Sequence, residues 1–218
     1  MPYSYEDILK DHNGKPIRVY RGEHGPVSDG LATQLASYSF CDNAETASVY
    51  ALHPNRIGDI VVAPRVMPGY LVICNPIFDC PEDPFIDISD LIDKFGLELA
   101  THFALKFAGY VEHTNNWEDI ILTEFEDIKS VQDLVDRRPE LLSRLYLYAF
   151  PLLDDPEFIG VARKHGYDGA IHHGNGESFE DIEFRIFSEE QFIPLFSSMA
   201  SPHTEAVLED SPIGLAAA

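Results

Sequence analysis

The apolar residues of this 218-residue chain change their spacing along the sequence, and this change constrains the fold more than any other feature. At residues 17–21 and 181–187, apolar and polar residues alternate, as in a strand with one buried face. Between about 86 and 150, the apolar residues recur at helical spacing. Strands at both ends and helices in the middle predict an α+β fold with a helical insertion, rather than a repeated strand–helix–strand sheet.

Capping residues, glycines and prolines predict the remaining elements. Further strands are expected over residues 38–41, 58–66 and 69–74, with the last two joined as a hairpin around 67–69, and residues 167–171 lead into another. Helices are expected over 43–52 (with a capping box of Asp42 and Glu45), 89–107, 130–149, and from Asp155-Pro156 to Gly166.

The composition limits the class of protein. With 45% hydrophobic residues, the chain can bury a core in one domain or at most two, and we expect one domain over 1–197. The composition changes only after this point, so 198–218 is predicted to be a loose tail. Fifteen Lys and Arg against 37 Asp and Glu give a net charge of −22, which disfavours a bulk nucleic-acid or membrane-surface binder.

No targeting, membrane or metal signal stands out in the sequence. No run approaches the roughly 18 apolar residues of a spanning helix, and the first residues lack the order of a signal peptide, so we expect a soluble, cytoplasmic protein. The three cysteines have no Cys-x-x-Cys spacing, which indicates free thiols. His172 and His173 are adjacent in a strand and point to opposite faces, so no metal site is predicted.

Residues 181–187 place Asp181, Glu183 and Arg185 on one face of a strand, and apolar residues on the other. Two carboxylates at this spacing can divide the work of catalysis: one stabilises a cation, and the other accepts a proton. The alternative interpretation is the solvated face of an outer strand.

Four other positions could contact a ligand, and each has a structural alternative. Arg21 ends the first strand, beside Gly22, where a guanidinium and an open backbone could hold a pyrophosphate, or the arginine could be structural or paired with solvent. Ser37 and Ser39 could orient a carboxylate or a ribose, or could face water. Tyr50 could stack on a planar ligand, or could pack in the core on a face shared with neighbouring alanines.

The order of these motifs resembles an ADP-ribosyltransferase domain of the arginine–serine–glutamate class, known from bacterial toxins and phage enzymes. The motifs lie at 19–22 (Val-Tyr-Arg-Gly), 37–40 (Ser-Tyr-Ser-Phe), 47–51 (Ala-Ser-Val-Tyr-Ala), 166–171 (Gly-Tyr-Asp-Gly-Ala-Ile) and 183–187 (Glu-Phe-Arg-Ile-Phe). The resemblance covers roughly residues 17 to 195 and implies a split, mostly antiparallel β-sandwich that clasps NAD. The helical insertion has no counterpart in it.

The resemblance also implies roles for single residues. Glu183 matches the catalytic glutamate, and Asp181 takes the position of an acceptor-side residue where protein-modifying members usually carry Glu or Gln. Arg21 is implied both as a catalytic residue that strains the dinucleotide into a reactive pose and as a contact to its phosphate. The other implied cofactor contacts are Gly22 to the nicotinamide amide, Ser37 and Ser39 as the two serines of a Ser-Thr-Ser motif, Phe40 beside them, and Tyr50 as a stacking ring.

The function implied is that of an enzyme of the glycosyltransferase class, an NAD-dependent mono-ADP-ribosyltransferase acting as a toxin or effector. It would move ADP-ribose from NAD to a macromolecule, expected to be a protein, with release of nicotinamide, in a cytoplasm that could be a host cell's. The acidic exterior favours a basic target. Two alternatives stay open: an NAD glycohydrolase on the same fold, and a non-catalytic binding or virion-associated protein.

Overall fold

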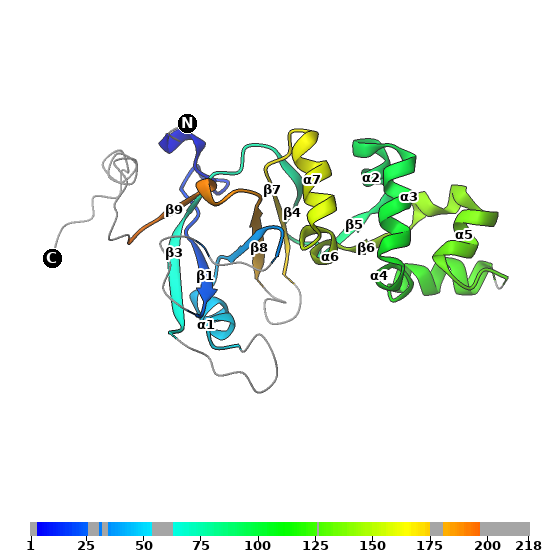
Figure 1. The fold of residues 1–218 in the computed structure, drawn as a ribbon, viewed down its shortest axis with the longest axis horizontal. Helices are drawn as coiled ribbons and strands as arrows, with labels where there is room; N and C mark the ends of the chain where they lie inside the picture. The colour runs from blue at the N-terminus through cyan, green and yellow to red at the C-terminus, as the bar shows by residue number, and fades with distance from the viewer. Residues whose placement is uncertain are drawn as a thin grey trace. The chain divides into compact units, whose positions relative to one another are not determined.

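The computed structural model describes residues 4–25, 31, 35–53, 63–125, 127–174 and 181–196, and it divides into two compact units (Figure 1). The first unit comprises Met1–Pro81 and Ala162–Ala218, and the second comprises Glu82–Val161. The predicted helical insertion at about 86–150 falls within the second unit. The predicted tail, 198–218, lies outside the described residues.

Seven strands of the first unit form one mixed sheet, in the order β4-β7-β8-β2-β1-β3-β9. All neighbouring pairs are antiparallel except β4 and β7, which confirms the α+β class and the mostly antiparallel sheet. The pairing joins these strands in one continuous sheet, not in two separate ones. The strands are β1 (Val19–Glu23), β2 (Tyr38–Cys41), β3 (Arg65–Leu71), β4 (Pro76–Cys80), β7 (Gly169–His173), β8 (Ile182–Ile186) and β9 (Phe192–Pro194).

The strand register puts an apolar and a polar face on β2 and β8. Phe40 lies opposite Phe184, and both belong to the main hydrophobic cluster of the unit. Ser39 lies opposite Arg185 and therefore on the other face. Because β8 lies between β7 and β2, the alternative of a solvated outer strand is wrong. The cluster consists of Val19, Phe40, Leu71, Ile73, Ile171, Phe184, Ile186 and Phe192.

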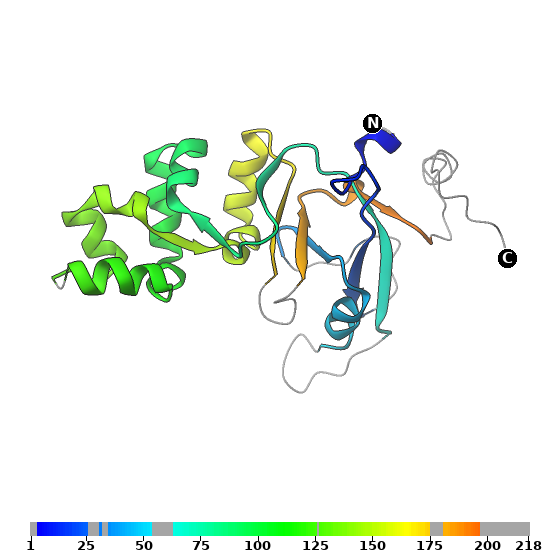
Figure 2. The same cartoon turned by 180° about the vertical axis from the view of Figure 1, so that it is seen from behind.

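Helix α1 (Ala44–Leu52) packs against β1, as the views from both sides show (Figure 1, Figure 2). The side chain of Asn43 caps it by accepting a hydrogen bond from the backbone N–H of Glu45 at 2.9 Å. The predicted capping box with Asp42 is wrong, because the Asp42 carboxylate accepts the backbone N–H of Ile182 at 3.3 Å instead.

The hairpin predicted around residues 67–69 is also wrong. Strand β3 runs straight through these residues, and β4 begins at Pro76, beyond the strand expected at 69–74. A Cβ added at Gly69 would lie 2.2 Å from the ring of Phe192, so this glycine permits a close contact with β9 and does not form a turn. Residues 58–62 of the predicted hairpin lie outside the described residues.

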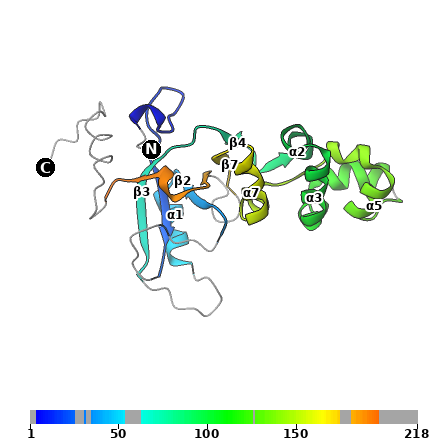
Figure 3. The same ribbon diagram turned by 45° about the horizontal axis from the view of Figure 1, so that its top comes forward.

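The second unit is mainly helical, with α2, α3 and α5 labelled in Figure 3, and it contains a two-stranded sheet of β5 and β6 (Figure 1). The helix predicted at 89–107 is broken at Gly96, which has φ +85°, and the one predicted at 130–149 is interrupted at Pro139. Its elements are β5 (Phe85–Asp87), α2 (Ile88–Phe95), α3 (Leu97–Lys106), α4 (Ala108–Glu112), a π-helix (Trp117–Leu122), α5 (Val131–Arg137), a 3₁₀ helix (Pro139–Arg144), β6 (Tyr146–Tyr148) and α6 (Ala149–Leu153).

Helix α7 (Pro156–Lys164) contains the point in the sequence where the two units meet. The residues predicted to begin and end this helix are confirmed. The Asp155 carboxylate accepts the backbone N–H of Phe158 at 2.9 Å, and Gly166, with φ +86°, follows its end. Two 3₁₀ helices, Tyr5–Asp7 and Glu189–Gln191, complete the first unit. Among the described residues, no helix has the length and apolarity needed to cross a membrane.

Candidate functional site

Three predicted site residues from three neighbouring strands are joined by hydrogen bonds through Ser39. Arg21 of β1 donates from Nη1 to the carbonyl oxygen of Ser39 on β2, at 2.8 Å. The Ser39 hydroxyl donates to Oε1 of Glu183 on β8, at 2.5 Å. Ser39 and Glu183 are 144 positions apart in the sequence, so only the strand order β8-β2-β1 brings the three together.

The Glu183 carboxylate is buried, with 7% of the residue exposed, and its two oxygens have different surroundings. Oε1 accepts from Ser39 and also pairs with Nε of Arg185 at 2.7 Å. Oε2 accepts no hydrogen bond in the part of the chain that the structure describes, and it lies 3.9 Å from Nε2 of His172. One oxygen is therefore anchored, and the other keeps its capacity to accept a hydrogen bond.

Opposing effects act on the charge of Glu183. Burial raises its pKa, while the positive charges of Arg185 and His172 and the hydrogen bonds from Ser39 and Arg185 lower it. The net result is a pKa below the ordinary value of 4.5. Glu183 is therefore a buried carboxylate that stays ionised at neutral pH.

Ser37 supports the site through Arg185. The buried Arg185 guanidinium donates from Nη1 to the Ser37 hydroxyl at 3.3 Å, on the same sheet face as Glu183. Of the two predicted serines, Ser39 thus contacts Glu183 directly, and Ser37 contacts the arginine that pairs with it.

Arg21 lies in a small group of charges at the end of β1. Its Nε pairs with Oε1 of Glu23 at 2.7 Å, and the second oxygen of Glu23 pairs with Arg65 at 2.8 Å. The guanidinium also lies over the rings of Tyr38 and Phe40, at 5.8 and 5.7 Å from their centroids. Two arginines and one glutamate leave this group with one net positive charge.

Asp181 is held by the start of α1. Asn43 donates from Nδ2 to Oδ1 of Asp181 at 3.2 Å, and the Thr46 hydroxyl donates to Oδ2. Both carboxylate oxygens therefore accept hydrogen bonds from side chains of the protein. This residue connects the beginning of β8 to α1.

The structure gives Gly22 and Phe40 packing roles. A Cβ added at Gly22 would lie 1.9 Å from the carbonyl oxygen of Ala47, so the close approach expected for a ligand is made by the backbone of α1. Phe40 is buried on the sheet face opposite Ser39, with its ring 4.9 Å from that of Phe192.

Tyr50 does not share the buried face of α1. Ala47 and Ala51 are buried there, whereas Tyr50 is 40% exposed. The interpretation that Tyr50 packs in the core beside these alanines is therefore wrong, because Tyr50 is one of the exposed residues of α1.

His172 is the site residue that sequence reasoning missed, because it was weighed only as a metal ligand. It lies directly opposite Glu183 in the β7–β8 ladder and is buried. If the strand expected after residues 167–171 had been paired as a hairpin with the strand at 181–187, in the observed register, His172 would have been placed opposite Glu183. In the described part of the chain, no group of three or more His, Cys, Asp or Glu side chains could hold a metal ion.

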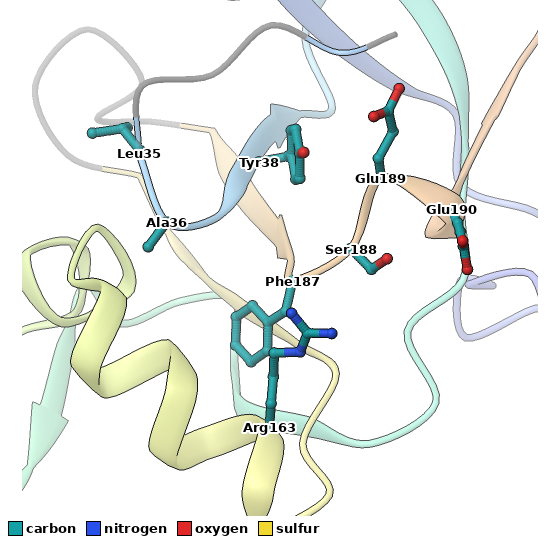
Figure 4. Close-up of a pocket in the computed structure, with 8 residues that line it drawn as sticks. All are labelled: Leu35, Ala36, Tyr38, Arg163, Phe187, Ser188, Glu189 and Glu190. Carbon is teal, nitrogen blue, oxygen red and sulfur yellow. The ribbon is translucent and has the colours of Figure 1, made fainter.

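A pocket of about 600 Å³ opens elsewhere in the first unit (Figure 4). It lies beyond the end of β8, whereas Glu183 lies near the start of that strand, and no predicted cofactor-binding or catalytic residue lines it. Its walls are Leu35, Ala36, Tyr38, Arg163, Phe187, Ser188, Glu189 and Glu190.

The chain was compared with known proteins. No family model, curated protein or solved structure matches it. Function is therefore inferred from the geometry of the site and from the resemblance of its motifs.

Proposed function

We propose that this protein is an NAD-dependent mono-ADP-ribosyltransferase, which moves ADP-ribose from NAD to a macromolecular acceptor and releases nicotinamide. The observation that supports this most is the hydrogen-bonded line from Arg21 through Ser39 to Glu183. These are the arginine, the serine and the glutamate that the motif resemblance implies, and they come from three separate segments of the chain.

The reaction breaks the bond between the nicotinamide nitrogen and C1′ of the ribose. The bonding electron pair leaves with nicotinamide, and positive charge develops on C1′ and the ring oxygen. Oε2 of Glu183, which accepts no hydrogen bond among the described residues, would accept one from the ribose 2′-hydroxyl and stabilise this charge. A lone pair of the acceptor then forms the new bond to C1′, and the acceptor loses its proton to solvent.

The motif resemblance assigns the pyrophosphate of NAD to Arg21, whose guanidinium lies over Tyr38 and Phe40, on the sheet face opposite the Glu183 carboxylate. The group of Arg21 with Glu23 and Arg65 carries a net positive charge, and guanidinium groups form strong paired hydrogen bonds with phosphate oxygens. A local positive charge of this kind permits an anionic cofactor to bind even though the whole chain has a net charge of −22.

The first unit would then be a variant of the ADP-ribosyltransferase fold, with the second unit as its helical insertion. The acceptor would be a protein, and the net charge of −22 favours a basic one. A toxin or effector of bacterial or phage type, acting in the cytoplasm of a host cell, fits this activity.

A second candidate, NAD glycohydrolysis, is favoured by the position of Asp181. Asn43 and Thr46 each donate to one oxygen of this carboxylate, so Asp181 is tied to α1 and has fewer acceptor positions left to orient a protein side chain. With water as the acceptor, the same bond cleavage would give free ADP-ribose and nicotinamide.

The test uses NAD labelled in its adenylate half, with and without cell lysate, and follows both free nicotinamide and labelled macromolecule. The wild-type protein is compared with Glu183→Gln, and with Glu98→Gln as a matched control at an exposed carboxylate of the second unit. Nicotinamide release should fall at least about a hundredfold in Glu183→Gln and stay unchanged in the control.

The outcome for the label separates the candidates. Label on a discrete protein, lost in Glu183→Gln, supports the transferase. Nicotinamide release without labelled macromolecule supports the glycohydrolase. If the wild-type protein releases no nicotinamide, both are wrong and the binding protein is left.

A further inference from the structure

His172 lies next to the carboxylate on which the proposed function depends. It is 1% exposed, and it pairs with Glu183 across the β7–β8 ladder. Its Nε2 lies 3.9 Å from Oε2 of Glu183, the oxygen that is not anchored by Ser39 or Arg185.

The other ring nitrogen indicates where the His172 proton lies. Nδ1 is 2.7 Å from the carbonyl oxygen of His173, and a carbonyl can only accept, so Nδ1 carries a hydrogen. In the neutral ring, Nε2 would then present a lone pair to the Glu183 carboxylate. In the protonated ring, it presents an N–H and a positive charge, which an ionised carboxylate favours.

Among the described residues, charged and titratable groups on the sheet face of His172 lie on three strands, and Asp181 just before β8 adds a second carboxylate. Arg185 on β8 carries a positive charge of the same sign as protonated His172, and it pairs with Oε1 of Glu183. Cys80 on β4 lies opposite His172 in the parallel ladder, and Cys41 on β2 lies opposite Glu183. Neither thiol supplies a positive charge, and among the described residues His172 and Arg185 are the cations that lie within 4 Å of this carboxylate.

We propose that His172 is a positioning residue for Glu183: held through Nδ1 by its own strand, it uses Nε2 to keep Oε2 of Glu183 ionised and oriented to accept a ribose hydroxyl. The catalytic part of this inference rests on the proposed function. The coupling between the imidazole and the carboxylate is a property of the protein alone and can be measured without substrate.

The first experiment follows the side-chain carboxyl carbon of Glu183 by NMR as the pH is changed. In His172→Gln, which keeps an amide donor but no titratable charge, the Glu183 midpoint should move up by about one pH unit relative to wild type. His173→Gln is the matched control, because this neighbour points to the opposite face of β7. An unchanged Glu183 midpoint in His172→Gln overturns the proposal.

The second experiment does not need a folded His172 variant, because coupling between two sites is reciprocal. The imidazole resonances of His172 are followed with pH in the wild-type protein and in Glu183→Gln. Removing the carboxylate charge should move the His172 midpoint to lower pH. Equal midpoints in the two proteins overturn the proposal.

The third experiment measures nicotinamide release as a function of pH. In His172→Gln, the acid limb of kcat/KM should shift upward together with the Glu183 midpoint, and kcat should fall about tenfold while KM for NAD changes less than about threefold. A merely structural role predicts lower thermal stability with an unshifted acid limb, which would contradict the proposal. If the wild type releases no nicotinamide, the proposed function is wrong, and the two titrations still decide whether His172 holds Glu183 ionised.

Discussion

Asp181 and Glu183 lie two residues apart and begin as chemical equivalents, but the structure gives them different neighbours. Asp181 accepts hydrogen bonds from two neutral side chains at the start of α1, Asn43 and Thr46. Glu183 is paired with Arg185, faces His172, and is anchored by Ser39 through one oxygen only. Asp181 is thus tied to α1 through both oxygens, whereas Glu183 is flanked by two cations and keeps one oxygen that accepts no hydrogen bond among the described residues. This difference suits Asp181 to a structural role and Glu183 to the role that the proposed function assigns to it.

The largest effect should come from removing the cation beside Glu183. Arg185→Met would leave a buried carboxylate without its ion-pair partner, and we expect the free energy of unfolding to fall by about 3–5 kcal/mol. Urea unfolding followed by circular dichroism measures it. Arg137→Met, at an exposed ion pair with Asp127, is the control and should cost less than about 1 kcal/mol. Equal losses in the two variants would mean that burial of the Glu183 pair is unimportant.

A smaller loss of stability is expected when the packing of α1, the helix that holds Asp181, is disturbed. Gly22→Ala places a methyl group where the backbone of Ala47 lies, so α1 must move, and we expect a loss of about 1–3 kcal/mol. Gly160→Ala in α7, where a Cβ meets nothing within 4 Å, is the matched control and should be neutral or stabilising. Thermal unfolding of both variants measures the difference, and an unchanged Gly22→Ala protein would contradict the packing described for α1.

Replacing Asp181 itself should separate stability from activity. Asp181→Asn loses one acceptor to α1, so we expect about 1 kcal/mol of destabilisation and nicotinamide release within about threefold of wild type. Release and urea unfolding are measured on the same preparation. A loss as large as that of Glu183→Gln would show that Asp181 acts in the reaction.

The smallest effect is on the pH dependence of stability, and its sign differs between carboxylates. The pKa of Glu183 is lower in the folded protein than in the unfolded chain, so the ionised side chain stabilises the fold at pH values above its unfolded-state pKa. This stabilisation is lost as the pH falls through the folded-state pKa. Between about pH 5 and about pH 3, Glu183→Gln should therefore lose less stability than wild type. Urea unfolding at several pH values measures this slope.

Asp42 provides the opposite case and serves as the control. Burial raises its pKa, so protonation of Asp42 favours the folded state as the pH falls. Asp42→Asn should therefore make the acid loss of stability steeper than in wild type. A change of the same sign in both variants would contradict the charge environments described here.

The sequence alone determined the features that depend on neighbours along the chain. The alternation at 181–187 predicted a strand and its two faces, a short strand was expected at 38–41, and Asp155-Pro156 and Gly166 predicted the limits of α7. The motif order also named Arg21, Ser39 and Glu183, which the structure brings together.

Tertiary structure decided the rest, because contacts between distant segments leave no local pattern. Gly69 was expected in a turn, but it accommodates the ring of Phe192, and Gly22 was expected to admit a ligand, but it accommodates α1. His172 joins the site only through the register of β7 with β8. Alternation and capping follow from the geometry of single elements, whereas the approach of one backbone to another depends on which strands become neighbours, and only the folded chain fixes that.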